Sequence, residues 1–228
     1  MEMIHSSMER HSVGTNVLQA IEETRLIAIL RGNLKDRAME IATALSESGV
    51  RVMEVTLNSP DALEAIRTIR KHAGSSVVLG AGTVLNSEEA EHAFDAGAEF
   101  IVSPHMSPAV IEKTKELGMA SFPGCFTPTE IVNGLACGAD AIKLFPGIAF
   151  SPANLRALLS ALGDIRLIPT GGITAANAAS YLEAGAWAFG VGSELVNLRA
   201  AGPLDTAALR ERARTFVSAI RAAREAIR

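Results

Sequence analysis

A lysine stands in the middle of an apolar run at residues 141–146, Ala-Ile-Lys-Leu-Phe-Pro. Side chains alternate along a strand, so Lys143 shares a face with Ala141 and Phe145. If that face is buried, desolvation disfavours the ammonium and lowers the pKa of the lysine. A neutral amine is a nucleophile suited to forming a Schiff base with a carbonyl substrate. Lys143 is therefore the first candidate catalytic residue.

A carboxylate is the second buried charge that the sequence predicts, because Glu54 lies within the apolar run Val-Met-Glu-Val at residues 52–55. Burying it is costly unless it is paired. One interpretation is a structural ion pair with Lys143 or Arg31. The other is a general acid and base with a raised pKa beside a Schiff-base lysine. The two interpretations do not exclude each other, and we favour catalysis.

Composition limits the fold and the ligands. The 228 residues fit one α/β barrel. Hydrophobic residues make up 48% of the chain and aromatic residues only 4%, and this composition predicts an aliphatic core. A net charge of -4 gives no electrostatic basis for binding nucleic acid. Cys125 and Cys137 have no metal or redox spacing, which fits a reducing cytosol. The histidines also lack ligand spacing, so we expect no metal site.

Residues 1–15 resemble neither a signal peptide nor a membrane anchor, and we expect them to form a flexible tail. No apolar run elsewhere approaches the length of about 20 residues that a bilayer span requires. The sequence therefore predicts a cytoplasmic protein without membrane partners.

Strand-like and helix-like runs alternate along the remaining chain, residues 16–228. The predicted strands are 26–30, 50–57, 77–84, 100–103, 119–122, 141–145, 166–169 and 187–191. The predicted helices between them are 35–48, 60–72, 87–96, 108–117, 129–137, 152–162 and 175–184. A glycine follows each of these helices, and four helices are preceded by a capping hydroxyl and a proline, at Ser59, Ser107, Thr127 and Ser151.

Eight repeats of about 23 residues predict a single-domain (β/α)8 TIM barrel. Further helices are expected at 16–23 before the barrel and at 206–227 behind it. A doubly wound sheet would require fewer strands or a glycine-rich turn after the first strand, and residues 30–32 lack the GxGxxG pattern.

A barrel places its active site at the carboxyl ends of the strands. The seventh and eighth predicted strands end in Gly171-Gly172 and in Gly192-Ser193. One interpretation is that these glycines do no more than form tight turns after the strands. Because they follow two neighbouring strands, with a helix start at 174–177, we expect their backbone N–H groups to bind a phosphate.

Arg31 ends the first predicted strand at the barrel mouth. It is either a solvated strand end or a bidentate ligand for a substrate carboxylate, and the sequence favours neither.

Several runs together resemble the aldolases of 2-keto-3-deoxy-6-phosphogluconate (KDPG), a family of class I aldolases. These are LIAILR at 26–31, EVTL at 54–57, GAGTV at 80–84, IVSP at 101–104, PG at 123–124, KLFP at 143–146 and PTGGI at 169–173. The resemblance extends from residue 17 to residue 197 in the correct order.

The resemblance implies a homotrimeric barrel that needs no cofactor and cleaves KDPG to pyruvate and glyceraldehyde 3-phosphate, and that also accepts 4-hydroxy-2-oxoglutarate. Lys143 would form the Schiff base, with Glu54 as acid and base. Thr83, Pro104 and Phe145 would line the pyruvate site. The substrate and phosphate contacts would come from Thr170, Gly171, Gly172, Gly192 and Ser193.

Asn58 departs from members that carry arginine there to hold the pyruvate carboxylate, and Arg31 is the natural substitute. Asn58 looks more like the branch acting on the 6-phosphogalactonate epimer, whereas Thr170 is similar to the gluconate branch. The galactonate activity is therefore an alternative. More remote alternatives are a phosphosugar epimerase or isomerase and a phospholigand-binding barrel without catalysis.

Overall fold

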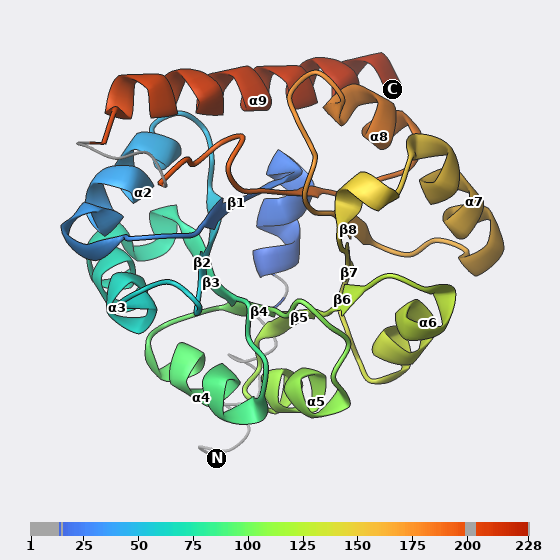
Figure 1. Ribbon diagram of the computed structural model, residues 1–228, viewed down its shortest axis with the longest axis horizontal. Helices are drawn as coiled ribbons and strands as arrows, with labels where there is room; N and C mark the ends of the chain where they lie inside the picture. The colour runs from blue at the N-terminus through green and yellow to red at the C-terminus, as the bar shows by residue number, and fades with distance from the viewer. Residues whose placement is uncertain (1–13, 15, 199–203, 228) are drawn as a thin grey trace.

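The computed structural model describes residues 14, 16–198 and 204–227 (Figure 1). The predicted tail, residues 1–15, lies outside the described residues except for Gly14. Figure 1 shows parallel strands near the centre, with helices α2 to α9 arranged around them. The chain is thus an α/β protein in which strands and helices alternate, as the sequence predicts.

The strands fall into two parallel sheets. The larger has the order β5-β4-β3-β2-β1-β9 and the smaller β6-β7-β8. Their bounds are β1 (Leu26–Leu30), β2 (Val52–Thr56), β3 (Val78–Gly82), β4 (Phe100–Val102), β5 (Ala120–Phe122), β6 (Gly124–Cys125), β7 (Ile142–Leu144), β8 (Leu167–Pro169) and β9 (Phe189–Val191).

The ladders differ from the single closed sheet of eight strands that we predicted. Pro123 separates β5 from β6, because proline has no N–H to donate to a ladder. β5 pairs with β4, whereas β6 pairs with β7. An isolated parallel bridge between Thr170 and Gly190 joins the end of β8 to β9.

The helices follow the predicted order with small shifts at their ends. They are α2 (Ala38–Ser46), α3 (Ala62–Ala73), α4 (Ser87–Asp95), α5 (Pro108–Glu116), α6 (Pro128–Ala136), α7 (Pro152–Leu162), α8 (Ala178–Glu183) and α9 (Thr206–Ile227), with short 3-10 turns η1 (Lys35–Arg37), η2 (Gly74–Ser76) and η3 (Gly147–Ala149). Residues 16–24 form the helix predicted before the first strand.

Local signals set most of the helix ends. The seven glycines predicted to follow helices all have positive φ, between 54° and 99°. Thr127 forms a capping box with Glu130, and the Ser151 hydroxyl accepts the Asn154 N–H. Ser107 is an N-cap without a side-chain hydrogen bond. The prediction for Ser59 is wrong, because the N-cap of α3 is Asp61.

Two apolar clusters occupy the two faces of the strands. The larger joins one strand face to the surrounding helices. The smaller contains Ile27, Val52, Phe100 and Ile168 from the opposite face. Residues of the helix 16–24 belong to this inner cluster, namely Val17, Ala20 and Ile21. Figure 1 shows that helix in dark blue at the centre of the ring. It covers the inner cluster, so a site on the inner face must open at the other end of the strands.

Strand β3 presents no side chain to the interior at two positions. A Cβ at Gly80 would lie 2.4 Å from the Phe100 ring, and one at Gly82 would lie 2.5 Å from Oε1 of Glu54. The first glycine therefore makes room for a core aromatic ring, and the second makes room for the carboxylate.

No helix among the described residues is long and apolar enough to cross a membrane. Cys125 and Cys137 are both free cysteines.

We expect Gly80→Ala to lower the free energy of unfolding by about 1–3 kcal/mol, because the new methyl group would force the buried Phe100 ring to move. Chemical denaturation of both proteins measures the change. Gly134→Ala in α6 is the control, since its Cβ would meet neighbours only at 3.3–3.5 Å. Its better helix propensity offsets this crowding to within about 1 kcal/mol. Equal effects of the two substitutions would contradict the packing argument.

Candidate active site

Lys143 and Glu54 come from β7 and β2, which lie on opposite sides of the strand ring (Figure 1). The predicted alternation is confirmed, because Ala141 and Val52, each two residues earlier, belong to the inner cluster. Only 3% of Lys143 and 2% of Glu54 is exposed. The two opposite charges therefore share one desolvated interior.

Burial shifts the pKa values of Lys143 and Glu54 in the directions that favour the neutral form of each group. It lowers the pKa of Lys143, which the negative charge of Glu54 opposes and the positive charge of Arg31 reinforces. Burial also raises the pKa of Glu54, which the charges of Lys143 and Arg31 oppose. The direction of each shift favours a neutral amine and a carboxyl group able to exchange a proton.

The predicted structural ion pair is not formed as a direct contact. Within the described part of the chain, no carboxylate oxygen of Glu54 lies within the 4.0 Å ion-pair limit of Lys143 or Arg31. Oε1 of Glu54 is buried and has no hydrogen-bond partner among the described residues. A buried unpaired oxygen is expensive, so this carboxylate is suited to accept a hydrogen bond from a bound molecule.

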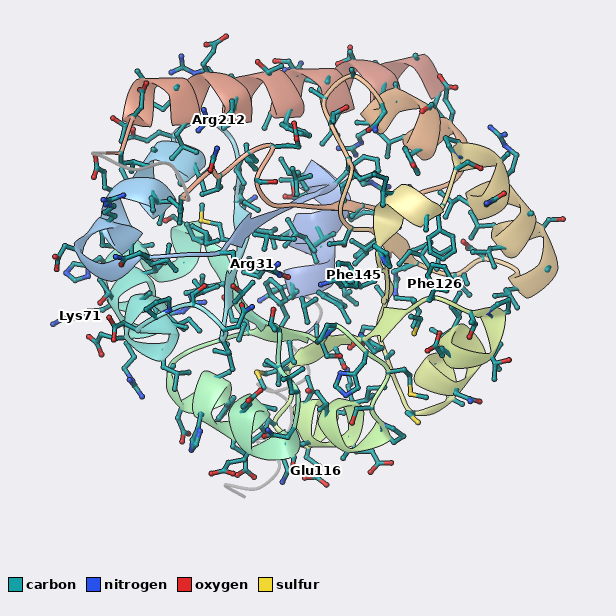
Figure 2. All side chains as sticks on the ribbon, in the orientation of Figure 1. Arg31, Lys71, Glu116, Phe126, Phe145 and Arg212 are labelled. Carbon is teal, nitrogen blue, oxygen red and sulfur yellow. The ribbon has the colours of Figure 1, made fainter. Side chains whose placement is uncertain are left out.

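A cavity of about 180 Å³ opens beside Lys143. Eight of the predicted site residues line it: Arg31, Lys143, Phe145, Thr170, Gly171, Gly172, Gly192 and Ser193. Figure 2 shows Arg31 and Phe145 near the centre of the ring, whereas Lys71 and Glu116 point outward. The cavity thus joins the buried amine to the predicted phosphate-binding glycines.

Phe145 stands beside the lysine, with Nζ of Lys143 5.0 Å from the centre of its ring. Phe145 is 37% exposed and lines the cavity, so it forms part of the wall between the amine and solvent. The contact is within cation–π range and also covers the amine with apolar surface.

Four predicted residues do not line this cavity, namely Glu54, Thr83, Pro104 and Asn58. Thr83 follows β3 in the left-handed conformation with φ 58°, which is strained for a β-branched side chain. Pro104 follows β4, and a Cβ at Gly124 would lie 2.5 Å from its carbonyl carbon. Asn58 is exposed in the turn after β2. Asn58 is therefore the predicted residue with the least structural support.

Glycines form the far end of the cavity. Gly171 and Gly172 have φ of 92° and 80°. A Cβ at Gly172 would lie 2.9 Å from Cβ of Ile148, so a side chain there would clash with η3. The helix start predicted at 174–177 is instead a turn, because Thr174 and Asn177 cap each other and α8 begins at Ala178.

The second glycine loop is held by the last helix. The Gly192 carbonyl accepts hydrogen bonds from the N–H groups of Leu195 and Val196. Nε of Arg212 on α9 donates to the carbonyl of Leu195 at 3.0 Å. Figure 2 shows Arg212 on the side of α9 that faces the rest of the molecule. This contact fixes the loop that follows β9.

Sequence reasoning missed two parts of the lining. Ile29 shares the inner face with Ile27 and precedes Arg31 by two positions, so the alternation rule could have found it. The segment 194–198 also lines the cavity, through Glu194, Val196, Asn197 and Leu198. It carries no motif, and only the course of the chain toward α9 brings it to the site.

Other reactive groups offer little chemistry here. Burial raises the pKa of the Cys125 thiol to about 12, so the thiolate is scarce at neutral pH. The described residues contain no cluster of three or more His, Cys, Asp or Glu side chains that could hold a metal ion.

The charges around Lys143 predict how its protonation responds to substitution. Glu54→Gln should lower the pH midpoint of Lys143 deprotonation, because a negative charge that favours the ammonium is lost. Arg31→Met should raise that midpoint toward the ordinary value of 10.5, because a repelling positive charge is lost. A titration of the Lys143 Cε chemical shift measures both. Glu116→Gln on the outer surface is the control, and shifts of the opposite sign would contradict the arrangement of charges.

The chain is similar to two kinds of aldolase. Residues 17–210 match the family described as KDPG and KHG aldolase. A probable 2-dehydro-3-deoxy-6-phosphogalactonate aldolase of Rhizobium meliloti is 40% identical over 76% of this chain and 82% of the relative. A 2-dehydro-3-deoxy-phosphogluconate aldolase of Treponema pallidum is 38% identical over 73% of this chain and 79% of the relative.

Solved structures agree in fold. A structure described as native KDPGal has a TM-score of 0.83 at 37% identity and covers 88% of this chain and 96% of its own. The KDPG aldolase of Legionella pneumophila, with pyruvate captured as a covalent carbinolamine intermediate, has a TM-score of 0.72 at 25% identity and covers 91% and 97%. Because the family model matches most of the chain and these relatives are 38–40% identical, this chain belongs to the KDPG and KHG aldolase family.

Proposed function

We propose that this aldolase cleaves 2-keto-3-deoxy-6-phosphogluconate to pyruvate and glyceraldehyde 3-phosphate through a Schiff base on Lys143. The observation that carries the proposal is the cavity itself, which joins a buried amine with a lowered pKa to the glycines after β8 and β9. One end suits a ketone and the other suits a phosphate. The related aldolase with a captured pyruvate carbinolamine supports covalent chemistry at the ketone end.

The first step is attack by the neutral amine of Lys143 on the C2 ketone. Loss of water from the carbinolamine gives an iminium, which withdraws electrons from the C3–C4 bond. Burial favours this step because it increases the fraction of amine that is neutral.

Glu54 is the proposed general base and acid. Its carboxylate removes the proton of the C4 hydroxyl, directly or through a water, while the C3–C4 bond breaks and its electrons form an enamine. Glyceraldehyde 3-phosphate then leaves. The protonated Glu54 returns the proton to C3, and hydrolysis of the resulting iminium releases pyruvate and the free amine. The unpaired Oε1 supports this role, because it has a free site for a hydrogen bond.

The remaining residues would hold the two ends of the substrate. The N–H groups of Gly171, Gly172, Gly192 and Ser193 are proposed to bind the phosphate. Arg31 is proposed to bind the carboxylate, since it lines the cavity next to Lys143 and Asn58 offers no positive charge. Thr83, Pro104 and Phe145 would surround the pyruvate half. Binding both ends aligns C2 with the amine, which raises the rate.

A galactonate substrate is the alternative, and the Rhizobium relative supports it. The two substrates differ at C4, the carbon whose bond breaks. Thr170 lines the cavity, and we propose that its hydroxyl recognises the C4 hydroxyl of the gluconate epimer. The shorter 4-hydroxy-2-oxoglutarate, which lacks a phosphate, would use the ketone end alone.

A phosphosugar epimerase or isomerase would use Glu54 as a base without a covalent bond to Lys143. A non-catalytic phospholigand-binding barrel would need neither group. Burial of both charges in one interior favours the aldolase over these readings.

We further propose that residues 16–228 form one domain whose strands close into a (β/α)8 barrel. The Thr170–Gly190 bridge and the hydrogen bond from the Trp187 N–H to the Leu167 carbonyl support closure between β8 and β9. On the other side, Pro123 alone separates β5 from β6.

The assembly we propose is a cytoplasmic homotrimer that serves the Entner-Doudoroff pathway. Exposed apolar side chains support association between copies, since Phe126 and Val132 are 50% exposed and Ile148 is 78% exposed. Light scattering measures the oligomeric state directly.

Borohydride reduction in the presence of pyruvate tests the covalent step. We expect a mass gain of one reduced pyruvate per chain, located at Lys143 by peptide mapping, because reduction converts the iminium to a stable amine. Lys143→Ala should show no adduct and no cleavage of the sugar acid.

Glu54→Gln is the matched variant for this experiment. It should still form the pyruvate adduct, while cleavage falls by about 10²- to 10⁴-fold because the proton transfer is lost. Absence of the pyruvate adduct in the unmodified protein would favour the epimerase or isomerase hypothesis. Unchanged cleavage by Lys143→Ala would contradict the aldolase mechanism altogether.

A cleavage assay with both C4 epimers tests the substrate. We expect higher kcat/KM for the gluconate epimer, and a loss of about tenfold on that epimer alone in Thr170→Val, which removes one hydrogen bond and keeps the shape. A higher kcat/KM for the galactonate epimer would establish the alternative substrate.

A further inference from the structure

The position of Arg31 gives little support to a side chain that is proposed to bind the substrate carboxylate in one fixed geometry. It follows the last residue of β1, Leu30, so no strand ladder holds it. Its side chain is long and the residue is exposed. A guanidinium loses much rotamer freedom when it binds, so its backbone must be held firmly if the geometry is to be reproducible.

Two hydroxyls, one from Thr56 at the end of β2 and one from Ser59 in the turn after it, hold the peptide groups on either side of Arg31. The N–H of Gly32 donates to Oγ of Ser59 at 3.0 Å. Oγ1 of Thr56 donates to the carbonyl of Leu30, with the two oxygens 3.4 Å apart. Oγ atoms of Thr56 and Ser59 lie 2.9 Å from each other.

These contacts fit one direction of donation. Each hydroxyl has a single hydrogen to donate. The Thr56 hydrogen goes to the Leu30 carbonyl, so the Ser59 hydroxyl must donate to Thr56, and Ser59 in turn accepts from Gly32. The result is a continuous chain from the N–H after Arg31 to the carbonyl before it. We call Thr56 and Ser59 the hydroxyl clamp.

The clamp is buried and rigidly placed. Thr56 is 0% exposed and Ser59 is 7% exposed. The N–H of Ser59 donates to the Thr56 carbonyl at 2.9 Å, which fixes the two residues relative to each other. Gly32 has φ 125°, and a Cβ there would lie 3.2 Å from Cβ of Leu198, in the segment that lines the cavity.

We infer that Thr56 and Ser59 are positioning residues that hold Arg31 over the cavity so that its guanidinium meets the substrate carboxylate. The inference rests on the carboxylate-binding role proposed for Arg31. It also explains why Ser59, despite its place before Pro60, does not cap α3: its hydroxyl is committed to Gly32 and Thr56.

Arg31 matters to the site beyond its contact with the substrate. Its positive charge lowers the pKa of both Lys143 and Glu54. Variants of the clamp keep this charge, so we expect them to change carboxylate binding more than proton transfer.

Steady-state cleavage of the phosphorylated sugar acid by Ser59→Ala and Thr56→Val tests the inference. We expect KM to rise by about five- to tenfold with little change in kcat, because each substitution removes two buried hydrogen bonds of the clamp while Lys143 and Glu54 remain. Thr56→Ser keeps the hydroxyl and should restore KM. Ser107→Ala removes a hydroxyl that makes no capping hydrogen bond, and it is the matched control.

A double-mutant cycle with Arg31→Met decides whether the clamp acts through Arg31. In that background Ser59→Ala should raise KM no further, because the group it positions is already absent. An equal rise in both backgrounds, or a rise with Thr56→Ser as large as with Thr56→Val, would overturn the inference.

Pyruvate trapping by borohydride separates the possible failures. Half-saturation of trapping should move to higher pyruvate in Ser59→Ala, since pyruvate carries the same carboxylate. If Arg31→Met leaves KM and trapping unchanged, the clamp inference fails while the aldolase proposal stands. If the unmodified protein forms no adduct, the proposed function itself fails. Circular dichroism and denaturation confirm that each variant is folded before its kinetics are compared.

Discussion

Burial of two opposite charges on the inner face of the strands is the constraint on which the rest of this structure depends. A lysine or a glutamate alone in such a place would cost several kcal/mol. Here each lies where its partner offsets part of that cost, yet the structure keeps them from forming a direct ion pair. A tight pair would hold both groups ionised, whereas this spacing leaves the amine biased toward its neutral form.

Glycines make that spacing possible. Gly82 leaves space for the carboxylate of Glu54, and Gly190 leaves space for the Thr170 hydroxyl, whose Oγ1 would lie 2.5 Å from an added Cβ. Below them Gly80 admits the Phe100 ring, which helps to seal the interior. The inner apolar cluster thus lies on one side of Lys143 and the cavity opens on the other.

Sequence alone predicted the features that arise from local rules. Alternation along a strand placed Lys143 and Glu54 on the same face as their inner-cluster neighbours, and glycines marked the helix ends. Features set by distant contacts escaped it. Ser59 carries the local signal of a helix cap, but Gly32, 27 residues earlier in the chain, competes for its hydroxyl. The 194–198 segment reaches the cavity only through tertiary structure. The predicted fifth strand ends at residue 122, and the short strand β6 after Pro123 was not predicted, because it is defined by its pairing with β7.

In recognition of the substrate's C4 hydroxyl, too, two partners compete for one hydroxyl group, here that of Thr170. The Thr170 hydroxyl donates to the Ile168 carbonyl at 3.1 Å. In the proposed mechanism the C4 oxygen gives its proton to Glu54 and becomes the aldehyde oxygen of the product, so it benefits from a donor rather than an acceptor. Thr170 can be that donor only by turning away from Ile168, which exchanges one hydrogen bond for another. The net gain is then smaller than that of a newly formed bond. A site of this kind distinguishes two epimers modestly, which accords with a family whose members act on either one.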